Sequence, residues 1–87
     1  MIDMAYELTE HARDSLRKRP NIRTEWIESV LDHPERVDPD KHDPELEHRL
    51  GRIREYDDRV LRVIVKKDTF PLKIITCYFD RTMRRKL

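Results

Sequence analysis

The sequence predicts an α+β domain in which two N-terminal helices pack on a small antiparallel sheet of three to four strands, with a short C-terminal helix after the sheet. Apolar residues recur every three to four positions in the first third of the chain, as in amphipathic helices, and alternate in the last third, as in strands. Prolines and acidic turn residues separate these regions. At 87 residues the chain is long enough for a single domain, spanning residues 1–87, with one modest core.

The first helix is predicted to begin after Thr9. Threonine is a suitable N-cap because its hydroxyl accepts a hydrogen bond from an amide of the first turn. Leu8, Ala12 and Leu16 then share one face at a spacing of four residues. Pro20 ends the helix, since proline lacks the amide that another turn would need.

A second helix is expected from the N-cap Thr24 to about Asp32, and Pro34 stops it. Its apolar stripe consists of Trp26, Ile27, Val30 and Leu31. Because each helix has one apolar side, we expect one face of the sheet to pack the helices. The other, mixed face is then left for binding.

The middle of the chain has weaker signals. Residues 37–47 are acidic, contain two prolines and have no apolar periodicity, so we expect an exposed loop. In residues 46–56 the apolar positions fit either a helix, at spacings of four and three, or a strand, at alternate positions. We favour a strand with a bulge near Gly51, where the apolar alternation changes parity.

The last third predicts a β-hairpin. Residues 59–66 are rich in β-branched side chains and follow a turn at 57–58, and residues 67–71 lead to a second strand at 72–79. In the first strand one face carries Leu61, Val63 and Val65, and the other carries Val60, Arg62 and Ile64. In the second strand the apolar set is Ile75, Cys77 and Phe79, and the mixed set is Ile74, Thr76 and Tyr78.

Charge is segregated along the chain. Residues 59–87 hold nine lysines and arginines against two aspartates, a net charge of +7, whereas residues 1–58 hold ten against sixteen acids, a net charge of −6. Many of the basic residues follow Asp80, which we expect to cap a short C-terminal helix with Met83 and Leu87 on one face. A surface of this kind attracts a polyanion such as RNA through its phosphates, or an acidic protein partner.

Several classes of function are disfavoured. No apolar run approaches the roughly 20 residues that cross a bilayer, and residues 1–4 lack the features of a signal peptide, so we expect no membrane association and a cytoplasmic location. The single cysteine, Cys77, lies in an apolar run and is expected to be buried rather than nucleophilic. With Gly51 as its one glycine, the chain has no phosphate-binding glycine loop. His42 and His48 have acidic neighbours but no recognised ligand spacing, so we expect no metal and no cofactor.

Short motifs near both ends of the chain resemble those of a known family. They are Glu10-His11-Ala12-Arg13, Arg19, Ile22, Trp26-Ile27, Val30-Leu31 and Pro34-Glu35 near the N-terminus, and residues 59–65, 75–81 and Met83-Arg84 near the C-terminus. Taken in this order, they resemble the bacterial family named domain of unknown function 4258 over nearly the whole chain from His11. The resemblance implies a compact domain with two helices against an antiparallel sheet, similar to the RelE-like and BrnT-like toxins that cleave messenger RNA.

For cleavage of RNA, the candidate catalytic residues are His11, Arg62 and Tyr78. Attack by the 2′-hydroxyl needs a base, an acid and cations that stabilise the charge on phosphate. Histidine suits the proton-transfer roles and arginine the electrostatic one. Each residue also has a structural explanation: His11 bonds a loop carbonyl, Arg62 pairs with Glu55 or Asp80, and Tyr78 is an ordinary sheet residue.

A set of basic residues is expected to bind RNA. It consists of Lys66, Lys73, Arg81, Arg84, Arg85 and Lys86. Basic residues in the last turn of a helix also complement the helix dipole, which is the structural alternative. Two functions therefore stay open: a RelE-like or BrnT-like toxin that acts on RNA and is partnered by an acidic or helical antitoxin, and a non-catalytic module that binds an acidic protein segment.

Overall fold

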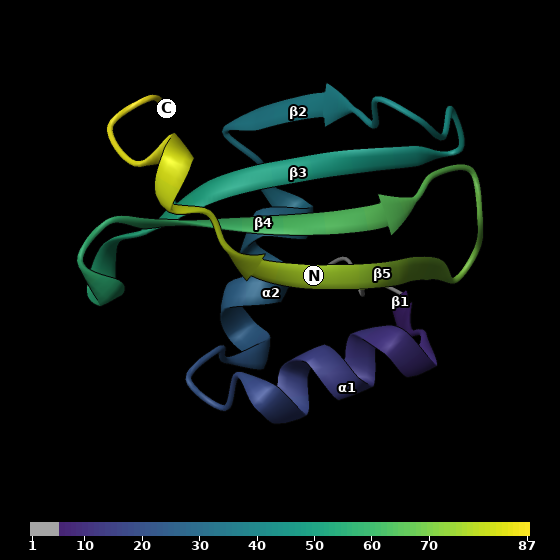
Figure 1. The fold of residues 1–87 in the computed structure, drawn as a ribbon, viewed down its shortest axis with the longest axis horizontal. Helices are drawn as coiled ribbons and strands as arrows, with labels where there is room; N and C mark the ends of the chain where they lie inside the picture. The colour runs from purple at the N-terminus through teal and green to yellow at the C-terminus, as the bar shows by residue number, and fades with distance from the viewer. Residues whose placement is uncertain (1–5) are drawn as a thin grey trace.

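A computed structural model describes residues 6–87 of the chain. These residues form one five-stranded sheet with the strand order β1-β5-β4-β3-β2, together with two α-helices (Figure 1). The strands are β1 (Tyr6–Leu8), β2 (Arg36–Pro39), β3 (Leu46–Ile53), β4 (Arg59–Lys66) and β5 (Leu72–Phe79). The helices are α1 (Glu10–Lys18) and α2 (Thr24–Asp32), and the 3₁₀ turns are η1 (Arg54–Tyr56) and η2 (Arg81–Met83). No helix in this part of the chain is long and apolar enough to cross a membrane.

The predicted antiparallel sheet of three to four strands is wrong, because the sheet is mixed and has two further edge strands. β1 pairs in parallel with β5, from Tyr6 opposite Leu72 to Leu8 opposite Ile74. At three residues, β1 is too short to show the alternation that identifies a strand. Three of the four residues of β2 lie inside the segment predicted as a loop, and β2 pairs antiparallel with β3. Pro39 is tolerated there because an edge strand uses only one side of its backbone for pairing.

Both helices occur where the sequence predicts them. The hydroxyl of Thr9 accepts a hydrogen bond of 3.2 Å from the amide of Ala12, which confirms Thr9 as the N-cap of α1. Thr24 is the first residue of α2 rather than its cap, and Arg23 occupies the N-cap without a side-chain bond. The predicted apolar stripe of α2 is buried in the core.

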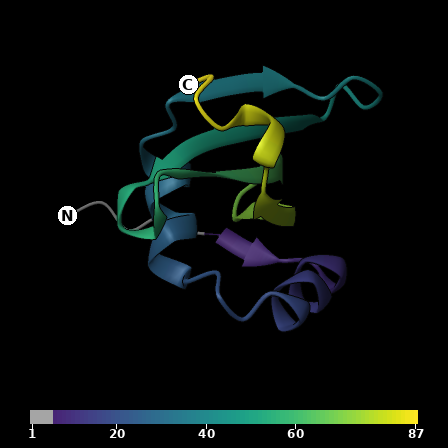
Figure 2. The same ribbon diagram turned by 60° about the vertical axis from the view of Figure 1, so that its left-hand side comes forward.

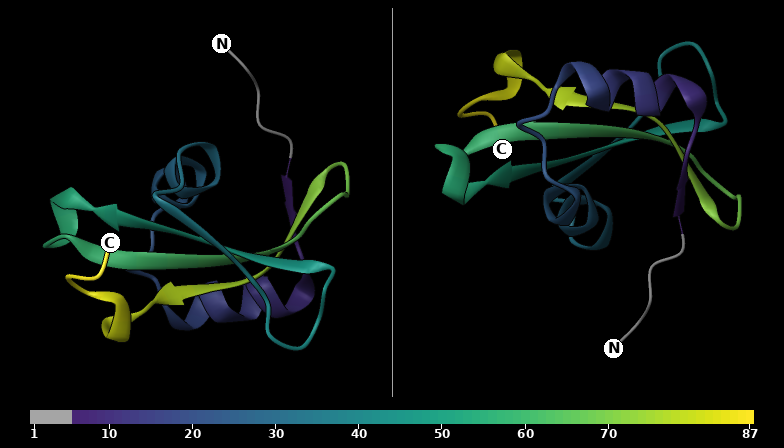
Figure 3. Two further views of the ribbon diagram at one scale, coloured as in Figure 1. Left: turned by 90° about the horizontal axis from the view of Figure 1, so that it is seen from above. Right: turned by 90° about the horizontal axis from the view of Figure 1, so that it is seen from below.

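The two helices lie on opposite sides of the sheet, so the expectation that one face packs both is wrong (Figure 3). α2 packs on β3 and β4, where Gly51 allows close approach: a Cβ at this position would lie 3.1 Å from Cγ2 of Val30. α1 packs along β5, where the Ser15 and Thr76 hydroxyls are 3.2 Å apart. In Figure 1 the face of β3 and β4 that carries Arg62, opposite α2, is turned toward the viewer, and we call it the open face.

The hairpin of β4 and β5 has the predicted bounds, and its preceding turn is confirmed by the positive φ of Asp57 and Asp58. The bulge lies in β5 rather than near Gly51, since Ile64 pairs with Thr76 and Val65 with Ile74. The pairing of β3 with β4 runs through Gly51 without interruption.

This bulge changes which residues of β5 reach the core. Ile75 is the extra residue, so side-chain parity reverses at that point. Ile74 therefore joins Cys77 in the core, and both are fully buried. The predicted assignment of Ile75 to the apolar set and Ile74 to the mixed set is wrong for this reason.

The predicted C-terminal helix is also wrong. Asp80 does act as a cap, accepting a bond of 2.9 Å from the amide of Thr82, but only the single turn η2 follows. Arg84 returns to extended backbone and Arg85 has a φ of 69°, which ends any helix. Few residues remain to offset the cost of helix nucleation. Instead η2 contacts β4, and the tail after it runs toward β2 (Figure 2).

Candidate functional site

A groove of about 510 Å³ lies where β5 ends and β4 begins. Its lining residues are Arg19, Asn21, Arg59, Val60, Phe79, Asp80, Arg81 and Arg84. Four of these eight residues are arginines, so we call this feature the arginine groove. A concentration of guanidinium groups around one hollow provides many hydrogen-bond donors for phosphate or carboxylate oxygens.

The fold assembles this groove from three distant parts of the chain. Arg19 is the C-cap of α1, Arg59 begins β4, and Arg81 belongs to η2. The antiparallel pairing of β4 and β5 brings the start of one beside the end of the other, and the amide of Asp80 donates a bond of 2.8 Å to the carbonyl of Val60. Because the groove depends on topology, no contiguous motif in the sequence marks it.

The arginines of the groove are largely free of carboxylates. Within residues 6–87, Arg19, Arg59 and Arg81 form no ion pair. Arg84 lies 3.5 Å from Asp57, and both side chains are about half exposed or more, so solvent screens this pair. The guanidinium of Arg59 instead covers the ring of Tyr56 at 4.7 Å from its centroid. The positive charge of the groove is therefore available to an anion.

The one acid of the groove, Asp80, is already compensated. Its Oδ2 accepts a bond of 2.9 Å from Nε of Arg62 and lies 2.8 Å from Nη2 of the same ion-paired guanidinium, and its Oδ1 accepts a bond of 2.6 Å from the hydroxyl of Thr82. Burial alone would raise the pKa of Asp80, but the hydrogen bonds from Thr82 and Arg62 outweigh burial and hold the pKa below its usual value. Asp80 therefore does not cancel the charge of the neighbouring arginines.

Three aromatic rings support the floor of the groove. The ring centroid of Phe79 lies 5.0 Å from that of Tyr56 and 6.1 Å from that of Trp26. The rings of Trp26 and Tyr56 are stacked, with their centroids 5.3 Å apart. The indole of Trp26 donates a bond of 2.7 Å to Glu55. A second hollow, of about 440 Å³, adjoins this cluster and shares Asn21 with the arginine groove.

The open face of the sheet carries a chain of polar side chains that ends at the groove. Nη1 of Arg62 lies 2.7 Å from Nδ1 of His48, and Nε2 of His48 lies 2.7 Å from Oδ1 of Asp40. Because a guanidinium only donates, Nδ1 of His48 accepts, and the ring proton sits on Nε2 and points to Asp40. The hydrogen bond from His48, followed by those from the amides of His42 and Asp43, lowers the pKa of Asp40 to about 2. We call Asp40, His48, Arg62 and Asp80 the polar chain.

A family model described as Domain of unknown function (DUF4258) matches residues 8–79. The chain belongs to the DUF4258 family. No curated protein and no solved structure matches it. The matched region spans both helices and strands β2 to β5, whereas Arg81 and Arg84 of the groove follow it.

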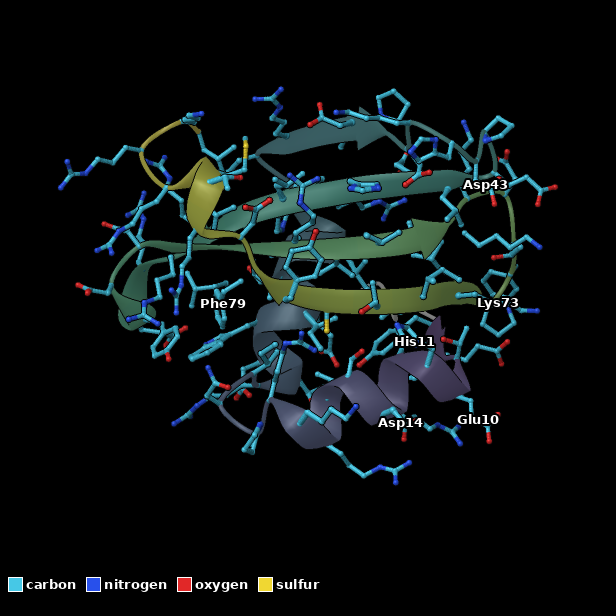
Figure 4. All side chains as sticks on the ribbon, viewed as in Figure 1. Glu10, His11, Asp14, Asp43, Lys73 and Phe79 are labelled. Atoms are coloured by element: carbon cyan, nitrogen blue, oxygen red, sulfur yellow. The ribbon has the colours of Figure 1, made fainter. Side chains whose placement is uncertain are left out.

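The three candidate catalytic residues are not brought together in this DUF4258 domain. Arg62 pairs with Tyr78 across β4 and β5, so these two share the open face. Of the two carboxylates considered for Arg62, Asp80 is its partner, and Glu55 bonds Trp26 instead. His11 is exposed on the first turn of α1, at the end of β5 opposite Phe79 (Figure 4).

The basic residues predicted to bind RNA divide between the two ends of the hairpin. Arg81 and Arg84 line the groove, and the exposed Arg85 and Lys86 follow in the tail. Lys66 and Lys73 pair with each other across the strands at the opposite end (Figure 4). Lys66 lies 3.6 Å from Glu45, and both side chains are exposed, so solvent screens this pair as it does the pair of Arg84 and Asp57.

The groove also contains residues that the sequence analysis did not select as candidate site residues, above all Arg19, Asn21 and Phe79. Arg19 precedes a helix-ending proline and Phe79 ends an apolar strand, so each has an ordinary local explanation. The contacts of His48 within the polar chain were missed for a similar reason, whereas the pairing of Arg62 with Asp80 was one of the two stated alternatives. His48 and Asp40 show no metal-ligand spacing, and their contact depends on the pairing of β2 with β3.

Neither a metal site nor a nucleophilic cysteine is supported among the described residues. Among residues 6–87, no group of three or more histidine, cysteine or acidic side chains has the geometry of a metal site. Cys77 is fully buried, as predicted, and burial raises the pKa of its thiol to about 11. The neutral, inaccessible thiol is not suited to nucleophilic chemistry.

Proposed function

We propose that this DUF4258 domain acts on RNA through the arginine groove, with the RNA phosphates held by Arg59, Arg81 and Arg84. The observation that carries this proposal is the convergence of four arginines on one groove, three of them with no carboxylate partner within residues 6–87. Arginine presents a planar fork of donors that matches phosphate oxygens. The exposed Arg85 and Lys86 extend the same positive surface along the tail.

The positions of the candidate catalytic residues favour binding of RNA at the arginine groove over cleavage of RNA there. His11 lies at the far end of β5 from the groove, so one phosphate cannot contact both (Figure 4). Arg62 is held by Asp80 and His48 rather than directed at solvent. We therefore propose RNA binding as the primary activity and treat cleavage as a second outcome of the same experiment.

A toxin of the RelE-like or BrnT-like kind, located in the cytoplasm and neutralised by an antitoxin, remains the biological role that we propose. Growth arrest on expression, relieved by co-expression of a small protein encoded next to this one, is the expected result. Normal growth at high expression, with RNA binding intact, contradicts the toxin role and leaves the binding proposal in place.

The test is a measurement of affinity for a fluorescently labelled single-stranded RNA between 50 and 200 mM salt. Affinity is expected to fall linearly on logarithmic axes, with a slope of about −0.7 for each phosphate contact. Arg81→Ala combined with Arg84→Ala should make the slope shallower by about 1.4 units. Arg13→Ala removes the charge of an exposed helix residue outside the groove and should leave the slope unchanged.

The same samples distinguish RNA binding at the groove from binding of an acidic protein and from cleavage of RNA. Salt-independent binding, or equal loss in the Arg13→Ala control, contradicts the groove as the RNA site. Tight binding of poly-glutamate with no binding of RNA favours the non-catalytic module for an acidic protein. Shortened RNA in the incubated sample identifies cleavage, and persistence of cleavage in His11→Gln removes His11 from the mechanism.

A further inference from the structure

The floor of the arginine groove is apolar. Its apolar lining residues are Phe79, which is partly exposed, and Val60, which is almost completely buried. A site for phosphate alone needs only donors and positive charge. A partly exposed aromatic ring beside those donors instead fits a ligand that combines an aromatic ring with an anionic group.

The ring of Phe79 is held in place before any ligand arrives. Trp26 meets it at an interplanar angle of 72°, in an edge-to-face arrangement, and Tyr56 meets it at 51°. Tyr56 is in turn covered by Arg59. A preorganised ring loses little conformational freedom when another ring stacks on it, so this arrangement favours stacking.

The rim of the groove carries a group that suits the polar edge of a base. The side-chain amide of Asn21 donates a bond of 3.1 Å to the hydroxyl of Tyr56. Its carbonyl oxygen accepts no hydrogen bond from residues 6–87 and is available to a donor on the ligand. The volume of about 510 Å³ lies within the roughly 300–1,000 Å³ that is common for small-molecule sites.

We infer that the arginine groove holds one unstacked nucleobase of the RNA against Phe79, with the flanking phosphates on the arginines. This inference rests on the proposed RNA-binding function and names its substrate class as single-stranded RNA. A base inside a duplex is stacked on both faces and cannot reach Phe79. The domain therefore discriminates against duplex RNA and against polyanions without bases.

A competition experiment tests this preference on the unmodified protein. A labelled ten-nucleotide single-stranded RNA is displaced by unlabelled single-stranded RNA, by its duplex, and by inorganic polyphosphate of matched charge. Single-stranded RNA is expected to compete at least tenfold better than either of the others. Equal competition by polyphosphate overturns the proposed base site but leaves the arginine groove as a site for phosphate. Absence of binding to any RNA overturns the proposed function and this inference together.

Photocrosslinking locates the base without a mutation. RNA carrying 5-iodouridine is irradiated in complex with the protein, and the crosslinked peptide is identified by mass spectrometry. A crosslink at Phe79 or Tyr56 is expected. Phe70, the most exposed large apolar side chain of the described residues at 89%, lies in the turn at the opposite end of the hairpin. A crosslink confined to Phe70 overturns the assignment.

Phe79→Leu separates stacking from charge, because it keeps an apolar side chain and removes the ring. Affinity for single-stranded RNA is expected to fall about five- to 150-fold, the range for loss of one base-to-ring stack, with no change for polyphosphate. Since Phe79 also packs against the core, Asn21→Ala serves as a second variant at an exposed position. Asn21→Ala should weaken RNA binding and spare polyphosphate binding. Equal losses for both ligands in both variants contradict the inference.

Discussion

Nη1 of Arg62 lies 2.7 Å from Nδ1 of His48, and this contact requires a neutral imidazole whose proton is on Nε2. Arg62 also binds Asp80, so a single guanidinium joins strand β3 to the residue that precedes the C-terminal turn. The side chains of both Arg62 and Asp80 are nearly buried, at 13% and 12% exposure. This geometry gives Arg62 a structural role at the open face of the sheet.

Replacing Arg62 with methionine should destabilise the domain by about 2–4 kcal/mol, because the nearly buried carboxylate of Asp80 then loses its partner. The free energy of unfolding is measured in urea. Arg17→Met is the matched control, since Arg17 pairs with Asp14 at 3.1 Å but both are largely exposed. The control should change stability by less than about 0.5 kcal/mol. Similar values for the two variants would contradict a structural role for Arg62.

Asp40 should make the stability of the domain depend on pH under acidic conditions. Its pKa is lowered from 3.8 to about 2 in the folded protein, so the unfolded chain binds the proton more readily. The stabilisation is therefore present above about pH 4 and is lost as the pH falls toward 2. Between pH 5 and pH 2, the free energy of unfolding should fall less steeply with decreasing pH for Asp40→Asn than for the unmodified protein. An identical decline contradicts the contribution of Asp40.

Gly51→Ala tests the close approach of α2 to the sheet. The added Cβ would lie 3.1 Å from Cγ2 of Val30, a β-branched residue that has little freedom to move. We expect a loss of about 1–2 kcal/mol from overpacking, even though alanine is usually better than glycine in a strand.

A double variant separates the steric explanation from a simple change of strand propensity. Val30→Ala by itself should cost stability through the lost burial of its methyl groups. If the contact between Gly51 and Val30 is responsible, Val30→Ala combined with Gly51→Ala should cost less than the sum of the two single changes. Strict additivity in thermal or urea unfolding contradicts the steric explanation.

The parts of the fold that were predictable are those with strong local signals. The periodicity and cap of α1, the apolar stripe of α2 and the hairpin of β4 and β5 all depend on residues close in sequence. The parts that were missed depend on partners that are distant in sequence. β1 and β2 are short edge strands, and the bulge at Ile75 is produced by the pairing of β5 with β4.

The candidate site follows the same division. Clustering of charge in residues 59–87 pointed to Arg81 and Arg84, and both lie in the groove. Arg19 is far away in sequence and reaches the groove only because α1 ends beside the end of β5. The Glu10-His11-Ala12-Arg13 motif gave no information on the distance of His11 from the groove. The topology places His11 at the end of β5 opposite Phe79 (Figure 4).

Cys77 offers a last prediction, which concerns the dynamics of the core. Its side chain on β5 is fully buried in the hydrophobic core, and burial raises the pKa of the thiol to about 11. A thiol reagent added to the native protein at pH 8 should therefore react only through opening of the sheet, since the thiolate is the reactive form. The labelling rate should rise in parallel with the unfolded fraction as urea is increased, and Gly51→Ala should accelerate it in proportion to its loss of stability. Fast labelling of the native protein, at the rate of a free cysteine, contradicts this packing of β5, because it would require Cys77 to face solvent.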